Sequence, residues 1–135
     1  MGTSSKALAR KLEKVAGRQH GCFTAAQAIR AGYADSVHLY HVRTGSWIRL
    51  FRGVYRLASF AKTPLSRCMA CLLWTRDKSG RIQGVLAPPT LDALQAGALS
   101  ISDPIYIAVD KHFRRSSSVP EGIKLATIDL SKHKT

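Results

Sequence analysis

Glycines divide the first 60 residues into short segments, and this spacing constrains the fold more than any other feature of the sequence. Glycines at positions 17, 21, 32, 45 and 53 separate stretches whose apolar residues recur at helical or strand spacing. A glycine ends a helix readily because it adopts the left-handed conformation without steric cost. The N-terminal half is therefore predicted to consist of short elements joined by tight turns.

Three helices and a hairpin are predicted from these segments. Apolar residues at helical spacing predict a helix over residues 4–16, with a serine as its N-cap. The stretch FTAAQAIRAG predicts a second, shorter helix capped by Thr24, and DSVHLYHVRTG predicts a third helix that ends at Arg43. A two-stranded hairpin over residues 46–58 follows.

This order of elements is that of a winged helix-turn-helix. Two short helices joined by a brief turn make the helix-turn-helix, and the hairpin makes the wing. The second helix of such a pair is the one expected to enter the major groove of DNA. The sequence thus predicts a winged helix-turn-helix DNA-binding domain over residues 1–62.

The second half of the chain has a different character. The stretch TPLSRCMACLLWTRDKSG predicts a buried helix with Pro64 near its start, an apolar stretch from Cys68 to Trp74 and Gly80 after its end. A short strand or turn and a small helix from Thr90 are predicted to follow. Strands are predicted over residues 104–110 and 123–130. We expect residues 63–135 to form a small α+β extension, which makes the whole chain α+β. The apolar helix could be core or a dimer face, and the extension could offer a dimer or partner surface.

The charge distribution favours an anionic partner. The chain carries a net charge of +13. Residues 1–63 hold eleven Lys/Arg and two acidic residues, so that +9 of the total belongs to the N-terminal half. Nucleic acid is the usual partner of such a domain. A membrane surface is the rival, but the basic helix SKALARKLEKVAGR has little aromatic or bulky apolar content.

Targeting signals are not evident in the sequence. No apolar run approaches the ~20 residues that span a bilayer, and the charged N-terminus lacks the apolar stretch of a secretory signal. We therefore expect a cytoplasmic, nucleoid-associated protein without a membrane partner.

The run FTAAQAIRAGYADSVHLYHVRTGSWIRLFRGVYRLA resembles the N-terminal winged-helix domain of AbiEi-type antitoxins, which are transcriptional regulators of type IV toxin–antitoxin (abortive infection) systems. The pieces that carry the resemblance are AGY, YHVRTGSWIRL and RGVYRLA, and looser likeness continues to about residue 130. The resemblance implies binding to an inverted-repeat operator, autorepression and a cognate toxin. The stretch APPTLDAL departs from the family pattern, and no large antitoxin domain follows, so DNA binding is favoured over toxin neutralisation.

Five residues of the third helix are candidates for contact with bases and phosphates. Leu39 and Val42 are expected to form the inner face of this helix, and His41 is either a core residue that holds the wing or a DNA contact. The candidates on the expected outer face are Ser36, Val37, His38, Tyr40 and Arg43.

The hairpin and the second helix supply the remaining candidates. In the hairpin, Ile48 and Leu50 are expected to anchor one strand face, with Trp47 in the core. Positive charge at a wing tip would suit a narrow minor groove or a phosphate, although edge-strand arginines can also serve solubility alone. The wing candidates are Arg49, Arg52, Gly53 and Arg56, and the candidates for a backbone clamp are Thr24, Gln27 and Arg30.

Enzymatic and metal chemistry find little support. The CMAC pair has metal-ligand spacing, but it lies in an apolar helical run with no second close pair. A nuclease could use Asp103, Asp110, Glu121 and Lys124, yet the acid-x-lysine spacing is missing. No nucleophile elbow or phosphate-binding glycine loop is present. We predict no enzyme, no cofactor and no metal site.

Two functions remain to be weighed. The first is a sequence-specific double-stranded DNA-binding protein, a transcriptional autorepressor with an antitoxin-like role. Because operators are inverted repeats, such a regulator is expected to form a homodimer or to bind as paired monomers. The second is a protein-interaction module that binds a toxin or another partner without specific DNA binding.

Overall fold

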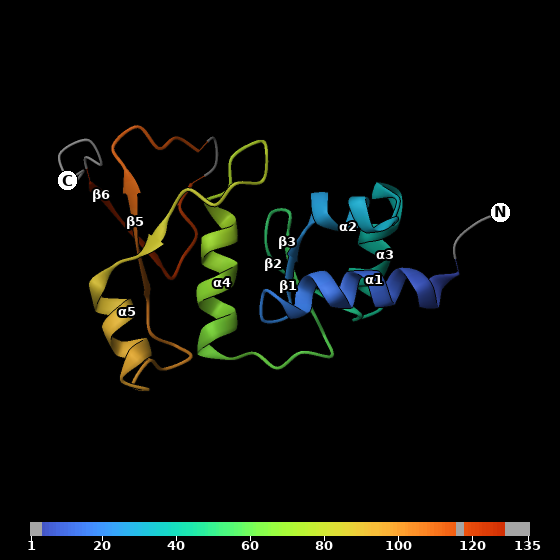
Figure 1. The fold of residues 1–135 in the computed structure, drawn as a ribbon, viewed down its shortest axis with the longest axis horizontal. Helices are drawn as coiled ribbons and strands as arrows, with labels where there is room; N and C mark the ends of the chain where they lie inside the picture. Colours follow the sequence, from blue (N-terminus) through green and yellow to red (C-terminus); the bar gives the residue numbers. More distant parts are fainter. Residues whose placement is uncertain (1–3, 116–117, 129–135) are drawn as a thin grey trace. The chain divides into compact units, whose positions relative to one another are not determined.

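The computed structural model describes residues 4–115 and 118–128 of the chain. Over this part the chain is a mixture of helices and strands, which confirms the α+β prediction (Figure 1). It divides into two compact units, residues 1–62 and 63–135.

The first unit contains three helices, a 3₁₀ turn and three strands. The three predicted helices and the hairpin are present, whereas the first strand was not predicted, because three residues are too few to show alternation. In chain order the elements are α1 (Ser5–Gly17), β1 (Cys22–Thr24), α2 (Ala25–Ala31), the 3₁₀ turn η1 (Asp35–Val37), α3 (His38–Arg43), β2 (Trp47–Phe51) and β3 (Val54–Leu57).

Local sequence explains where these helices begin and end. The Ser4 hydroxyl accepts a hydrogen bond from the Ala7 amide at the start of α1, as the serine N-cap prediction requires. Thr24 and Gln27 form a reciprocal capping box at the start of α2. Gly32 ends α2 with φ 122°, a conformation that L-residues rarely adopt.

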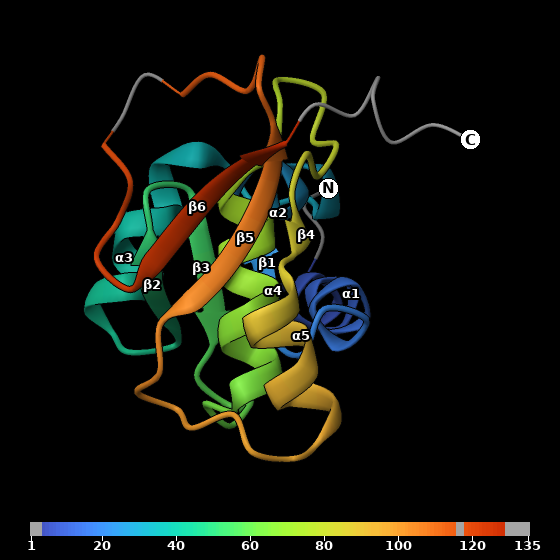
Figure 2. The same cartoon turned by 90° about the vertical axis from the view of Figure 1, so that its left-hand side faces the viewer.

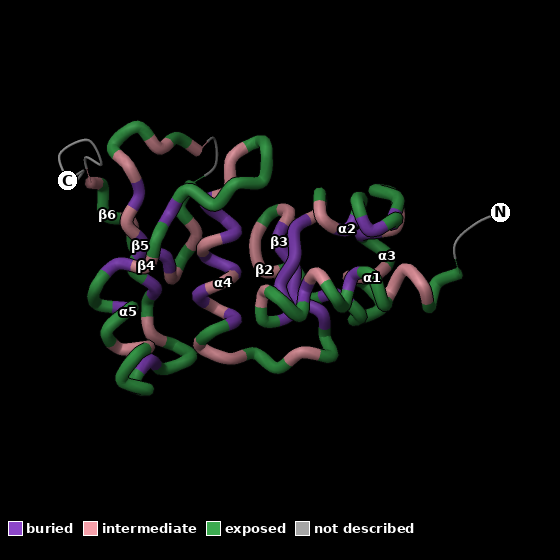
Figure 3. Tube along the Cα trace, in the orientation of Figure 1, coloured by how far each residue is buried: buried purple, intermediate pink, exposed green. Residues whose placement is uncertain are grey.

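The strands of the first unit form an antiparallel sheet in the order β1-β3-β2. The central strand β3 is buried along its whole length (Figure 3). Helices α1, α2 and α3 each contact this sheet. Leu12 and Ala16 of α1 pack there with Phe23, Trp47 and Tyr55, which are the centre of the hydrophobic core.

Strand β2 departs from the predicted alternation. Ile48 was expected to anchor the strand, but its side chain is 36% exposed, whereas Trp47 is only 2% exposed. The pairing of β2 with β3 shifts register between Arg49 and Phe51, so Leu50 has no regular partner. Trp47, not Ile48, therefore anchors the first strand of the wing.

The second unit has a three-stranded sheet of order β4-β5-β6 with two helices. Strands β4 and β5 are antiparallel, and β5 and β6 are parallel neighbours, as Figure 2 shows. Residues 129–130 of the predicted last strand lie outside the described residues. The elements are α4 (Pro64–Trp74), β4 (Val85–Leu86), α5 (Pro88–Gln95), β5 (Ile105–Asp110) and β6 (Ile123–Ile128).

Helices α4 and α5 both contact β5, the middle strand of this sheet. Helix α4 begins at Pro64, which was predicted near its start, with a capping box between Thr63 and Ser66, and it ends at Trp74, earlier than the predicted end before Gly80. Alternate residues of β5 are buried, beginning with Ile105. Most of the CMACLLW stretch of α4 is buried as well, which favours its interpretation as core.

Candidate nucleic-acid interface

One face of the η1–α3 segment is exposed and carries four side chains of mixed chemistry. Ser36 and Arg43 are exposed, and Leu39 and Tyr40 have exposed fractions of 56% and 62%. Residues three, four and seven positions apart lie on the same side of a helix. The segment therefore presents a hydroxyl, an aliphatic group, a phenol and a guanidinium side by side.

The opposite face of α3 packs on Trp47 at the start of the wing. The rings of His41 and Trp47 are stacked, with centroids 4.7 Å apart and planes 21° apart. The His38 ring lies 5.1 Å from the same indole. Val42 packs against the same core. Helix and wing are thus joined through one tryptophan.

Trp47 is also in contact with the rest of the aromatic core. Its ring centroid lies 4.9 Å from that of Phe23, 5.2 Å from that of Tyr33 and 5.5 Å from that of Tyr55. Edge-to-face and tilted arrangements of this kind each contribute ~0.5–1.5 kcal/mol beyond burial. We call these rings, together with His38 and His41, the Trp47 cluster.

The structure corrects the predicted orientation of α3. His38, predicted to contact DNA, is 5% exposed and belongs to the Trp47 cluster. Val37, also predicted to contact DNA, is partly buried against the core. Leu39, predicted to face inward, points to solvent instead. The 3₁₀ turn η1 precedes α3 and changes the phase of the chain, so a continuous helical period misplaces these three residues.

The two histidines of α3 differ in their surroundings. Burial lowers the pKa of His41, and the nearby His38 lowers it further, so His41 is a neutral aromatic ring at neutral pH. His41 lies against the wing, as the core alternative for it predicted. His38 has Nδ1 3.8 Å from a carboxylate oxygen of Asp35, and its Nε2 is buried without a hydrogen-bond partner among the described residues.

The wing tip is a two-residue turn between β2 and β3. Arg49 and Arg52 are exposed, and Gly53 has φ 72°. The Gly53 carbonyl accepts a hydrogen bond of 2.9 Å from the amide of Ala25, the first residue of α2. The tip of the wing is therefore tied to the start of the helix-turn-helix.

Arg56 does not belong to the exposed wing. It lies on the central strand β3 and is buried, and its Nε donates to the carbonyl of Phe60 at 3.1 Å. A long side chain can bury its methylene groups while its polar end finds a backbone acceptor. The prediction that Arg56 contacts DNA is corrected on these grounds.

Of the three residues predicted to clamp the DNA backbone, only Arg30 has an exposed side chain. The Thr24 hydroxyl accepts from the Gln27 amide, and Gln27 Oε1 accepts from the Thr24 amide at 2.9 Å. Thr24 is buried, and its side chain is used by this capping box. The prediction that Thr24 contacts the DNA backbone is therefore corrected. Gln27 is half-buried and bonded to Gln19, whereas Arg30 is exposed.

Metal-binding geometry is not found in the part of the chain that the structure describes. Within residues 4–115 and 118–128, no three His, Cys, Asp or Glu residues lie close enough to hold a metal ion. The three cysteines are buried thiols. Burial raises the pKa of Cys22 to about 11, an effect that Arg56 partly opposes, and burial also raises the pKa of Cys68. Among the described residues, no helix is long and apolar enough to cross a bilayer.

The exposure of Leu39 and the place of His38 in the Trp47 cluster are the features that sequence reasoning missed, whereas Trp47 was expected in the core. The sequence signal for the cluster was available, because Phe23, Tyr33, Trp47 and Tyr55 are large aromatic residues within one short unit. Two histidines three positions apart can join such a cluster through one helix face. No comparable signal marks Leu39, since exposed leucine on a short helix resembles a core residue.

Comparison with known proteins gives a family match for the first unit. No curated protein matches the chain. Residues 10–58, which extend from α1 to the end of the wing, match the family described as "Transcriptional regulator, AbiEi antitoxin". The match covers the helix-turn-helix and the hairpin, the same stretch that carries the resemblance in the sequence. Over residues 10–58, the first unit of this protein is therefore similar to the AbiEi antitoxin family of transcriptional regulators.

Proposed function

We propose that the first unit binds double-stranded DNA in a sequence-specific manner and represses transcription, including that of its own gene. The observation that carries the proposal is the division of α3 into two faces. One face is fixed to the wing through His38, His41 and Trp47, and the other presents Ser36, Leu39, Tyr40 and Arg43 to solvent. A helix that enters the major groove needs both a firm inner face and a chemically varied outer face.

Each exposed side chain of α3 has a natural partner on a base pair. Arg43 can donate two hydrogen bonds to O6 and N7 of guanine, and Ser36 can donate or accept. The apolar side chain of Leu39 suits the methyl group of thymine. Tyr40 has a hydroxyl group that can reach a base edge or a phosphate.

The wing and the charge balance support the same function. Arg52 and Gly53 at the tip of the wing would lie against a phosphate or in the adjacent minor groove, and Arg49 would contact the backbone. The concentration of +9 of the net charge in residues 1–63 favours approach of this unit to DNA. A protein with this activity would associate with the nucleoid.

The partners follow from the mode of binding. An inverted-repeat operator would be occupied by two copies of the chain related by a two-fold axis. The family assignment adds a cognate toxin as the second partner of this chain. In the alternative function, a toxin or another protein is the only partner and DNA is not bound specifically.

A binding titration on the DNA upstream of the protein's own gene tests the proposal. The variants are Arg43→Ala and Arg52→Ala, and Arg81→Ala serves as the matched control, because Arg81 is an exposed arginine of the second unit. Loss of a bidentate base contact should weaken binding by ~1–3 kcal/mol, or about fivefold to 150-fold, for Arg43→Ala. Arg52→Ala should reduce the slope of log K for DNA binding against the logarithm of the salt concentration by ~0.9, because one phosphate contact is lost.

Two outcomes would contradict the proposal. If neither variant binds more weakly than Arg81→Ala, the assignment of helix and wing is wrong. If the wild-type protein binds no duplex even at low salt, the protein-interaction function takes its place.

A further inference from the structure

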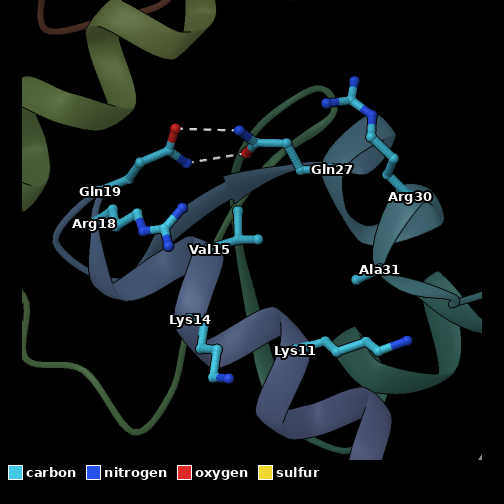
Figure 4. A pocket seen from close by; sticks show the side chains of 8 residues that line it. All are labelled: Lys11, Lys14, Val15, Arg18, Gln19, Gln27, Arg30 and Ala31. Carbon is cyan, nitrogen blue, oxygen red and sulfur yellow. Dashed lines mark hydrogen bonds between the residues drawn. The ribbon is translucent and has the colours of Figure 1, made fainter.

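A pocket between α1 and α2 has a strongly basic rim. Its volume is about 510 Å³, and its walls come from α1, the two residues that follow it and α2 (Figure 4). Lys11 and Lys14 line it from α1, Arg18 lines it from the C-cap of α1, and Arg30 lines it from α2. A volume of this size is typical of ligand sites.

No carboxylate balances these four cations in the part of the chain that the structure describes. The contact found there between a carboxylate and a basic side chain joins Asp35 to His38, and it does not involve the pocket. Glu13, the acidic residue of α1, lines a different pocket beside Tyr33 and Trp47. Four positive charges around one hollow repel one another, so an anion bound there would lower the electrostatic free energy.

The spacing of the cations on α1 suits a row of phosphate groups. Lys11 and Lys14 are three positions apart and lie on one face of α1, and Arg18, the C-cap in a right-handed helical conformation, continues that face. At ~1.5 Å per residue, these cations extend over roughly 10 Å of the helix. A DNA strand carries one phosphate per ~3.4 Å of helix axis. Figure 4 shows the charged ends spread around the rim, which fits several linked phosphates better than one small ion.

A pair of glutamine side chains holds the two walls together. Gln19 Nε2 donates to Gln27 Oε1 at 3.0 Å, and Gln27 Nε2 donates to Gln19 Oε1 at 3.1 Å. Gln19 also donates to the carbonyl of Cys22. Gln27 is fixed in addition by its capping box with Thr24. The pocket is therefore formed before any ligand arrives, which reduces the entropy cost of binding.

We infer that the pocket between α1 and α2 is a binding site for linked phosphate groups. The phosphates can come from the backbone of bound DNA or from a dissolved polyphosphate compound. The first source rests on the proposed function, since the first helix of a helix-turn-helix crosses the DNA backbone and α2 is that helix here. The second source would make the pocket a ligand site independent of DNA.

A matched pair of double variants tests the inference. Lys11→Gln with Arg18→Gln removes two charges from the pocket, and Lys6→Gln with Arg10→Gln removes the same two charge types from the exposed surface of α1 outside it. Glutamine has nearly the helix propensity of lysine and arginine, so α1 should persist in both. Far-UV circular dichroism checks this before binding is measured.

Two measurements distinguish the two sources. Fluorescence anisotropy follows a labelled duplex of about 20 base pairs, of operator or scrambled sequence, between ~50 and ~200 mM salt. If the backbone occupies the pocket, the pocket variant loses ~1.8 in the slope of log K against log salt, and operator and scrambled duplexes are weakened equally. Calorimetry with inorganic tripolyphosphate tests the dissolved source. In that case the pocket variant loses tripolyphosphate binding while its DNA binding matches that of the surface variant.

The inference is overturned if the pocket variant and the surface variant behave alike in both measurements. Arg43→Ala in the same anisotropy series separates this result from failure of the proposed function. If Arg43→Ala weakens operator binding and the pocket variant does not differ from the surface variant, the DNA-binding function stands and the phosphate site falls.

Discussion

Substitution of Trp47 by alanine should remove most of the stability of the first unit. The Trp47 side chain is 2% exposed, and five rings of α3 and the core surround it. Replacement of a buried tryptophan by alanine costs ~3–5 kcal/mol. Domains are stable by ~0.05–0.15 kcal/mol per residue, which gives roughly 3–9 kcal/mol for a unit of this size. Trp47→Ala should therefore leave the first unit close to its unfolding midpoint at room temperature.

Equilibrium unfolding in urea measures this effect, with far-UV circular dichroism and the fluorescence of Trp74 as the two signals. Trp74 lies in the second unit, so its emission reports separately on that unit when Trp47 is absent. The matched control is Ile48→Ala, the neighbouring residue of β2. Because Ile48 is partly exposed, its loss should cost only about 1 kcal/mol, the span of strand propensity.

The comparison of these two variants can refute the reasoning. If Ile48→Ala lowers the free energy of unfolding as much as Trp47→Ala does, β2 faces the other way and the alternation predicted from the sequence was right. The joining of α3 to the wing through Trp47 would then also be wrong.

Three further substitutions or reagents test individual groups. The folded-state pKa of His41 lies below its unfolded value near 6.5, so the free energy of unfolding should be fully retained above that pH and should fall as the pH drops from there toward the folded pKa. His41→Phe keeps a ring on Trp47 and should make the melting temperature depend less on pH between about pH 7.5 and 5.5. An unchanged pH dependence would contradict the lowered pKa of His41. Thr24→Ala should lower the free energy of unfolding by ~1 kcal/mol because the capping box is lost, and Thr24→Ser should restore most of this loss. The affinity of Thr24→Ala for DNA should stay near that of the wild type at temperatures where the unit is folded. The buried thiols of Cys22 and Cys68 should resist Ellman's reagent at pH 8 in the native protein and react in guanidinium, so rapid reaction of either in the native state would show that its side chain is accessible.

Backbone chemistry made the element boundaries predictable. Serine and threonine caps, glycines with positive φ and Pro64 determine where helices begin and end, and each acts through its own local conformation. Such effects depend on a few adjacent residues, so the sequence alone reveals them. The order of the helices and the hairpin, and hence the winged helix, followed from the same signals.

Which side chains point to the core and which to solvent was harder to predict, because this depends on tertiary contacts. Hydropathy ranks leucine above histidine for the inner face of α3, yet a flat imidazole stacks on Trp47 and Leu39 does not lie there. Arg56 was assigned to the surface by its charge, but the carbonyl of Phe60 and its place on the central strand bury it. In both cases the deciding partner is distant in sequence or lies on another element.

The hydrogen bond between Ala25 and Gly53 has a consequence for the kinetics of association. It ties the tip of the wing to the start of α2, so we expect that the hairpin does not move as an independent flap. A partner that meets both α3 and the wing then encounters one prearranged surface and needs no loop closure after first contact. Without a slow rearrangement, and with a strongly basic unit to attract it, an anionic partner should bind at a rate set by diffusion and charge, which rises as salt is lowered.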